Sequence, residues 1–209
     1  AALPQALGNI RSMACLTRRD LMDQQAGNAG GLVITGSHVG MTTRQLEAVQ
    51  GSERLRGNLE WIEFHVDGDL AREAAQVRAR AEAAIFEGKT AMVYTSRKLL
   101  APEGASEEAL LAISVRISEA LTSVVRELQL RPAFLIAKGG ITSSDVGVRG
   151  LGVRRARVAG QIRPGIPVWQ LGDESRFPGM HYVIFPGNVG TPDTLRSILE
   201  ELMEKSDES

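Results

Sequence analysis

The chain has a single cysteine, Cys15, among 209 residues, so no disulfide can form within it. This scarcity favours a reducing compartment, and we expect a cytoplasmic protein. Cysteines and histidines do not cluster at metal-ligand spacing, so we expect no metal site built from them. Apolar runs all fall short of the roughly 18 residues that span a bilayer, and no hydrophobic secretory segment opens the chain. A membrane is therefore not an expected partner.

An excess of one charge is also missing. Lysine and arginine together number 24 and aspartate and glutamate 25, which leaves a formal net charge of -1. Basic residues do not alternate with aromatic ones, which make up only 4% of the chain. Because affinity for nucleic acid rests on concentrated positive charge, we do not expect a nucleic acid partner.

The chain is 43% hydrophobic, enough for one sizeable core. We expect a lead-in segment over residues 1–30 and a single domain over 31–205. β-rich runs predict strands at 32–35, 61–66, 91–95, 134–137 and 182–185. Helical periodicity and capping residues predict helices at 42–49, 69–87, 106–131 and 143–151 and from Thr191 onward, with Pro192 in the first turn. Residues 153–171 read as short strands and turns.

Strands that alternate with helices predict an α/β domain: a three-layer Rossmann-like fold with a mostly parallel sheet covered by helices on both faces. In such sheets, ligands bind beyond the carboxyl ends of the strands. The glycine-rich turns of this chain fall at those ends. They are Thr-Gly-Ser at 35–37, Lys-Gly-Gly-Ile-Thr-Ser at 138–143 and Pro-Gly-Asn-Val-Gly-Thr at 186–191.

Any one of these turns could simply reverse the chain. Three turns with the same order of strand, glycine and helix instead predict one crevice lined by backbone N–H groups, which suits the phosphates of a nucleotide. Lys138 could reach a phosphate or be solvated. The Gly-Lys-Thr at 88–90 is no P-loop, because Ala83 stands where a glycine is needed and the segment joins a helix to a strand. Ser37 next to His38 lacks the nucleophile elbow of a serine hydrolase.

The chain resembles the C-terminal, nucleotide-binding domain of the four-carbon acid sugar kinase family, also called DUF1537. Four motifs carry the resemblance, in the family's order: Gly-Ser followed by Thr-x-x-Gln (36–37, 42–45), Gly-Gly-x-Thr-Ser (139–143), Pro-Gly-x-Pro (164–167) and Gly-Asn-x-Gly (187–190). The lysine that many members carry two positions before the last motif is Phe185 here.

The resemblance implies ATP as cofactor together with Mg²⁺. The predicted cofactor-binding residues are Ser37, Gly139, Gly140, Ile141, Thr142, Ser143, Gly187 and Asn188. Asp145 is either an acid linked to the magnesium or a partner of the helix dipole.

The resemblance also implies a further, N-terminal domain that binds the acid sugar (threonate, erythronate or an oxo-tetronate) and carries the catalytic base. No such domain is found in this sequence, which begins at Ala1, so we expect half of a kinase that is inactive alone. An apolar face left by that domain could promote a homo-oligomer. Two alternatives stay open: a non-catalytic nucleotide-binding or docking module, and a fragment of another α/β enzyme such as a dehydrogenase.

Overall fold

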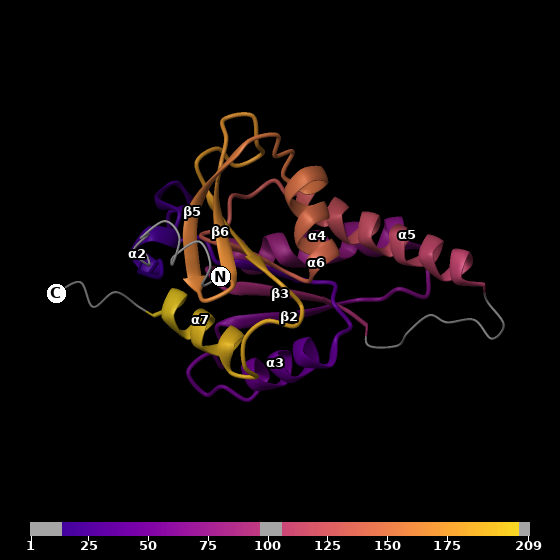
Figure 1. The fold of residues 1–209 in the computed structure, drawn as a ribbon, viewed down its shortest axis with the longest axis horizontal. Helices are drawn as coiled ribbons and strands as arrows, with labels where there is room; N and C mark the ends of the chain where they lie inside the picture. The colour runs from indigo at the N-terminus through magenta and orange to yellow at the C-terminus, as the bar shows by residue number, and fades with distance from the viewer. Residues whose placement is uncertain (1–13, 97–105, 205–209) are drawn as a thin grey trace, which may run out of the picture.

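The computed structural model describes residues 14–96 and 106–204 (Figure 1). Within these ranges the chain forms a seven-stranded sheet with the order β2-β3-β1-β4-β7-β6-β5. The strands are β1 (Leu32–Thr35), β2 (Leu59–Phe64), β3 (Thr90–Thr95), β4 (Leu135–Lys138), β5 (Ala156–Arg163), β6 (Ile166–Leu171) and β7 (His181–Phe185). Strands β2, β3, β1, β4 and β7 are parallel, and β6 and β5 are antiparallel to their neighbours. The predicted mostly parallel α/β fold is confirmed.

Helices cover both faces of this sheet (Figure 1). One face carries α3 (Gly40–Gln50) and α7 (Thr194–Leu202), whose apolar side chains share a buried cluster with Val33, Ile136 and Val183. The other face carries α4 (Leu70–Phe86), α5 (Glu107–Arg126) and α6 (Gly140–Asp145). Because both faces are covered, the central strands read as continuous apolar runs, and β1 is buried along its whole length.

Three parts of the sequence expectation need correction. The strands and turns predicted over 153–171 are present, but they form one antiparallel hairpin whose strands β5 and β6 are longer than expected, with register shifts in β5 that hide its alternation. Strand β2 begins and ends two residues earlier than predicted, because its pairing with β3 runs from Leu59 to Phe64. Pro192 precedes α7 instead of occupying its first turn, since Asp193 is the N-cap.

Helix α5 begins at a serine cap and is long enough to extend past the sheet (Figure 1). Ser106 caps α5 by accepting a hydrogen bond from the Ala109 N–H at 3.2 Å, as its sequence predicts. The first half of α5 extends past the sheet (Figure 1), and Leu111 is 66% exposed there.

The described part of the lead-in holds α2 (Arg18–Leu21) and a 3₁₀ turn (Gln24–Ala26), with Leu21 buried in the core. Across the described ranges, no helix combines the length and apolar character that crossing a membrane requires.

Candidate nucleotide site

The glycine-rich turns follow three adjacent strands. In the sheet order, β1, β4 and β7 lie side by side, and their last residues, Thr35, Lys138 and Phe185, are in register. The turns that follow them, 36–39, 139–142 and 186–191, therefore start at the same edge of the sheet. This is the convergence that the sequence predicts, and it places the predicted cofactor residues within one small region.

Ser37 lies at the centre of this region. A Cβ added at Gly187 would stand 2.7 Å from the Ser37 Oγ, and one added at Gly139 would stand 3.1 Å from the Ser37 Cβ. Gly139 also has a φ of 124°, which side chains rarely allow, and its N–H donates to the Phe185 carbonyl at 2.8 Å. Glycine at both positions is thus what permits the second and third turns to approach the first.

The turn after β4 opens directly into α6. The helical ladder begins with the Ser143 N–H, which donates to the Gly139 carbonyl at 2.9 Å, so the N–H groups of residues 140–142 have no backbone partner within the part of the chain that the structure describes. Gly140 and Ile141 are exposed, Ile141 by 72%. The helix continues without interruption into a π-helical turn over Val146–Gly150. An anion placed at this helix start would meet open donors and the positive end of the dipole.

Ser143 takes a different part from the one predicted. Its side chain is buried, and its hydroxyl donates to the carbonyl of Gly139, one turn earlier in the helix. Its own carbonyl accepts a hydrogen bond from the Tyr182 hydroxyl at 2.7 Å. Ser143 thereby fixes the position of α6 on β7, whereas Thr142, next to Gly36, lies on the side of the first turn.

The turn after β7 is held by side chains of α3. The Thr42 hydroxyl donates to the Gly187 carbonyl at 3.0 Å, and the Gln45 amide donates to the carbonyls of Val189 at 3.1 Å and Thr191 at 2.8 Å. These two residues form the Thr-x-x-Gln of the sequence, a spacing that puts both on one helix face. The motif is visible in the sequence, but a role in positioning was not predicted for either residue.

The hairpin turn reaches the same edge. Its Gly165 lies against Val189, since an added Cβ would stand 3.3 Å from the Val189 Cγ1. The Pro-Gly-x-Pro segment therefore joins the other motifs, and all four that carry the family resemblance meet at the carboxyl ends of β1, β4 and β7. Asn188, one of the predicted site residues, is exposed in this turn.

Lys138 is not solvated, which corrects one of the two sequence interpretations. Its side chain is fully buried, with the Nζ 3.3 Å from the Pro186 carbonyl and 3.4 Å from the Gly187 carbonyl. The same Nζ lies 3.8 Å from the centroid of the Phe185 ring. Burial lowers the Lys138 pKa from 10.5 to about 8. A cation therefore lies beneath the turn after β7, although Phe185 occupies the position of the family's lysine.

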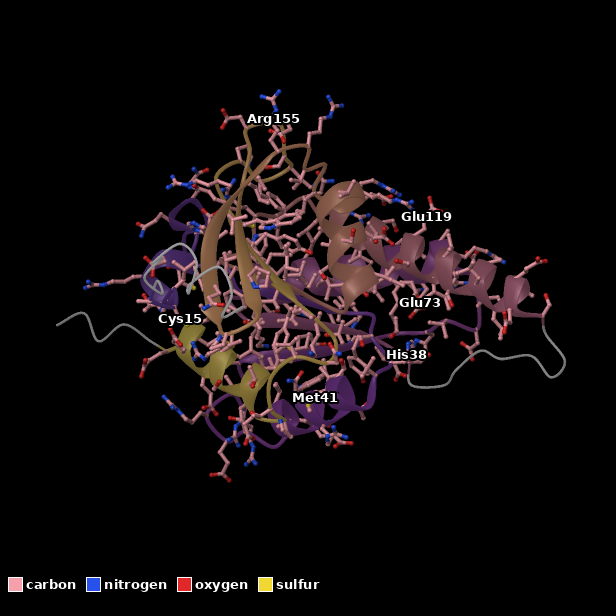
Figure 2. The ribbon with its side chains drawn as sticks, in the orientation of Figure 1. Cys15, His38, Met41, Glu73, Glu119 and Arg155 are labelled. Atoms are coloured by element: carbon pink, nitrogen blue, oxygen red, sulfur yellow. The ribbon has the colours of Figure 1, made fainter. Side chains whose placement is uncertain are left out.

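Asp145 does not face the glycine turns as a free acid. It accepts a hydrogen bond from the Ser118 hydroxyl at 2.6 Å, and its other oxygen is 3.8 Å from the Arg149 Nε. It stands at the last residue of α6, so a partnership with the positive end of the helix dipole is also wrong. His38, labelled in Figure 2, has its Nε2 3.1 Å from the Ser96 carbonyl at the end of β3. Ranges 14–96 and 106–204 contain no group of three or more acidic, His or Cys side chains suited to a metal ion.

The connections that follow the parallel strands β1 and β4 go to opposite faces of the sheet. Strand β1 leads to α3 on one face of the sheet, and β4 leads to α6 on the opposite face. At such a switch point the two connections diverge and leave a crevice beyond the strand ends, where α/β proteins bind their ligands. The glycine turns after β1 and β4 flank this point.

A cavity of about 650 Å³ opens at the opposite edge of the sheet. Its lining includes Asn28, Asn58 and Phe134, and Arg54 there is paired with Glu200 and Glu204. It contains none of the predicted cofactor residues. Phosphate binding depends on convergent donors more than on volume, so the glycine turns remain the better candidate.

Glycine turns at the switch point of a mostly parallel sheet define the class of Rossmann-like nucleotide-binding domains. The chain belongs to the family of nucleotide-binding C-terminal domains, whose sequence model matches residues 32–195. That stretch contains all four motifs. No curated protein sequence matches the chain.

Solved structures share this fold. A DUF1537 protein from Bordetella bronchiseptica, crystallised with citrate as a domain-swapped dimer, aligns with a TM-score of 0.58 and 21% identity over 83% of this chain and 41% of that one. A second crystal form of it gives a TM-score of 0.57 and 16% identity over 86% and 41%. A Salmonella typhimurium LT2 protein, provisionally assigned as a tRNA synthase, gives 0.52 and 20% over 80% and 40%. The chain thus spans about two fifths of the length of these proteins.

Proposed function

We propose that the chain is the ATP-binding half of a kinase that phosphorylates a four-carbon acid sugar of the threonate, erythronate or oxo-tetronate class. The observation that carries the proposal is the convergence of the three glycine turns on Ser37 at the switch point. Membership of the nucleotide-binding family supports the nucleotide, and the resemblance to acid sugar kinases supports the reaction.

In this proposal the phosphates lie against backbone N–H groups. Those of Gly140, Ile141 and Thr142 at the start of α6 would hold one phosphate, and the exposed turn at Asn188 would hold another. ATP, when bound, supplies the phosphoryl group, and the chain supplies orientation and fixed positive dipoles. Because the described residues offer no acidic cluster, Mg²⁺ would enter with the phosphates.

The acid sugar would be bound by the domain that the resemblance implies. The chain spans 41% of the Bordetella protein, which leaves room there for a separate domain, and that protein was crystallised with citrate, a small polycarboxylic acid. The same protein forms a domain-swapped dimer, which supports self-association here. Ile141 and Val39, both exposed apolar residues in the glycine turns, would be covered when the second domain closes.

A non-catalytic nucleotide-binding module is the second candidate, and one observation favours it. Residues 36–39, 139–143 and 186–191 contain no carboxylate that could take the proton of the substrate hydroxyl, and the Nε2 of their histidine, His38, lies 3.1 Å from the Ser96 carbonyl. In the kinase proposal that base belongs to the sugar-binding domain. Turnover of threonate or erythronate by a protein that carries both domains would decide for the kinase, and ATP binding without turnover would decide for the module.

The first test is calorimetric titration of the chain with ATP, ADP and NAD, each with and without Mg²⁺. We expect saturable binding of ATP and ADP and weak or no binding of NAD. Preference for NAD would indicate a dehydrogenase fragment instead. Absence of binding by all three nucleotides would contradict the proposal that the chain forms the nucleotide site.

A further inference from the structure

A buried cation lies below the turn 186–191. Thr35, Lys138 and Phe185 are the last residues of β1, β4 and β7, and they share the sheet face that α3 and α7 cover. The Lys138 Nζ interacts with the Phe185 ring and with the carbonyls of Pro186 and Gly187. In the described part of the chain no carboxylate pairs with it, which is unusual for a fully buried lysine.

Among the described residues, those that surround this ammonium group are uncharged. Strand β1 presents Thr35, α3 presents Thr42 and Gln45, and β7 presents Phe185. None of these side chains titrates near neutral pH. The positive charge is therefore compensated only by carbonyl dipoles and by the face of an aromatic ring.

The three polar side chains act on one side of the turn. Lys138, Thr42 and Gln45 donate to carbonyl oxygens of the turn, and together they engage those of residues 186, 187, 189 and 191. The carbonyl side of the turn is thus held toward the protein interior by donors from β4 and α3.

The opposite side of each peptide must then face outward. In a planar trans peptide the N–H points away from the carbonyl of the preceding residue. With the Gly187 and Val189 carbonyls held inside, the N–H groups of Asn188 and Gly190 point away from the interior. Both residues are exposed, and neither N–H has a backbone partner within the described ranges. The Val189 N–H between them donates to the Pro186 carbonyl at 3.5 Å, so the turn offers an anion the two N–H donors of Asn188 and Gly190.

We propose that Lys138 is a positioning residue, an inference that rests on the proposed nucleotide site. Its ammonium group, together with Thr42 and Gln45, holds the carbonyls of the 186–191 turn toward the interior, so that the turn presents its N–H groups to a nucleotide phosphate. The ammonium group lies on the interior side of the turn and the phosphate would lie on the outer side, so the cation acts on the phosphate through the peptide groups between them. Loss of the Lys138 charge would release two carbonyls and remove the charge that the phosphate faces.

This arrangement makes nucleotide affinity depend on pH. Since the Lys138 pKa is about 8, the charged fraction falls about tenfold between pH 7 and pH 9. Phosphate groups have a pKa of about 6 and keep their charge over that range. A bound phosphate stabilises the ammonium form, so binding takes up a proton and weakens as the pH rises above 8.

The test is calorimetric titration with ATP between pH 7 and pH 9 on the wild type, Lys138→Met and Lys89→Met. Lys89 is an exposed lysine paired with Glu87, so its variant is the matched control. We expect about a tenfold loss of affinity across the range for the wild type and for Lys89→Met. Lys138→Met should bind at pH 7 about as weakly as the wild type at pH 9, with a flat profile. A Lys138→Met variant with wild-type affinity and pH profile would overturn the inference.

A second measurement needs neither ligand nor variant. The ¹³C carbonyl shifts of Pro186 and Gly187 should titrate with a midpoint near pH 8 in the unliganded wild type, because the Lys138 ammonium donates to both oxygens. If these shifts titrate while ATP fails to bind at any pH, the proposed function is wrong and the positioning role stands. If ATP binds and the shifts do not titrate, the positioning role is wrong.

Discussion

Burial of Lys138 has a cost that can be measured as stability. Its pKa falls from 10.5 to about 8 on folding. Because one pKa unit corresponds to about 1.4 kcal/mol, the charged lysine destabilises the folded state by about 3 kcal/mol at a pH where it is protonated in both the folded and the unfolded state. Replacement of Lys138 by methionine keeps the aliphatic stem and removes the charge. We therefore expect Lys138→Met to be more stable than the wild type at pH 7, even as it weakens nucleotide binding.

The direction in which stability changes with pH follows from the number of protons that the folded and the unfolded chain bind. The folded pKa lies below the unfolded one, so between about pH 8 and pH 10.5 the unfolded chain binds more protons, and wild-type stability rises with pH across that window. Below pH 8 the full cost is present, and above 10.5 it is gone. The advantage of Lys138→Met should thus be largest at pH 7 and shrink as the pH rises to about 10.5.

The assay is urea unfolding of the wild type and Lys138→Met at several pH values from 7 to 10.5, read as the difference between the two proteins so that other titrating groups cancel. Lys89→Met, at an exposed position, should give a difference that lacks this trend. Loss of the two hydrogen bonds to carbonyls will offset part of the gain, by about 1 kcal/mol each. A difference that stays constant with pH would show that folding does not lower the Lys138 pKa.

Two further predictions concern the glycine turns. An added side chain at Gly140 meets no atom within 4 Å, so Gly140→Asp should fold, and at about 6 Å and an effective dielectric of about 40 its carboxylate should weaken ATP binding about tenfold per phosphate charge. Gly68→Asp, equally unobstructed and in the turn between β2 and α4, should bind ATP like the wild type, and equal losses in both variants would contradict the phosphate site at the start of α6. Gly187→Ala should weaken ATP binding about tenfold because its Cβ would stand 2.7 Å from the Ser37 Oγ. Ser37→Ala in the same chain should restore part of the loss, and a calorimetric double-mutant cycle without coupling would argue against contact between the turns.

The sequence predicts the parallel part of the fold well because its signals are local. β1, β4 and β7 are short apolar runs that end in glycine turns, and α4 and α5 carry caps and helical periodicity. For residues 153–171 the sequence predicts strands and turns but not the bounds and pairing of β5 and β6, because register shifts interrupt the alternation of β5 and Pro167 stands inside β6. These strands are specified by partners in the sheet more than by their own pattern.

In the candidate site, too, residues in local motifs are predicted from the sequence, and contacts between distant parts of the chain are not. Ser37, Gly139 and Gly187 are predicted from glycine-rich motifs, and the structure brings them into contact. The environment of Lys138 could not be predicted, because Phe185 and the Pro186 carbonyl lie almost fifty residues away in the chain and meet the lysine only through the β4–β7 register. For the same reason the roles of Thr42 and Gln45 follow from the position of the 186–191 turn and not from the motif alone.

We expect the nucleotide to bind at the carboxyl edge of the sheet and not in the cavity of about 650 Å³ at the opposite edge. Hydrogen exchange followed by mass spectrometry, with and without ATP and Mg²⁺, distinguishes the two edges directly. We predict slowed exchange on ATP binding in peptides that cover residues 36–43, 139–145 and 186–191. Slowed exchange confined to residues 27–31 and 54–58, which line the cavity, would place the nucleotide there and contradict the proposed site.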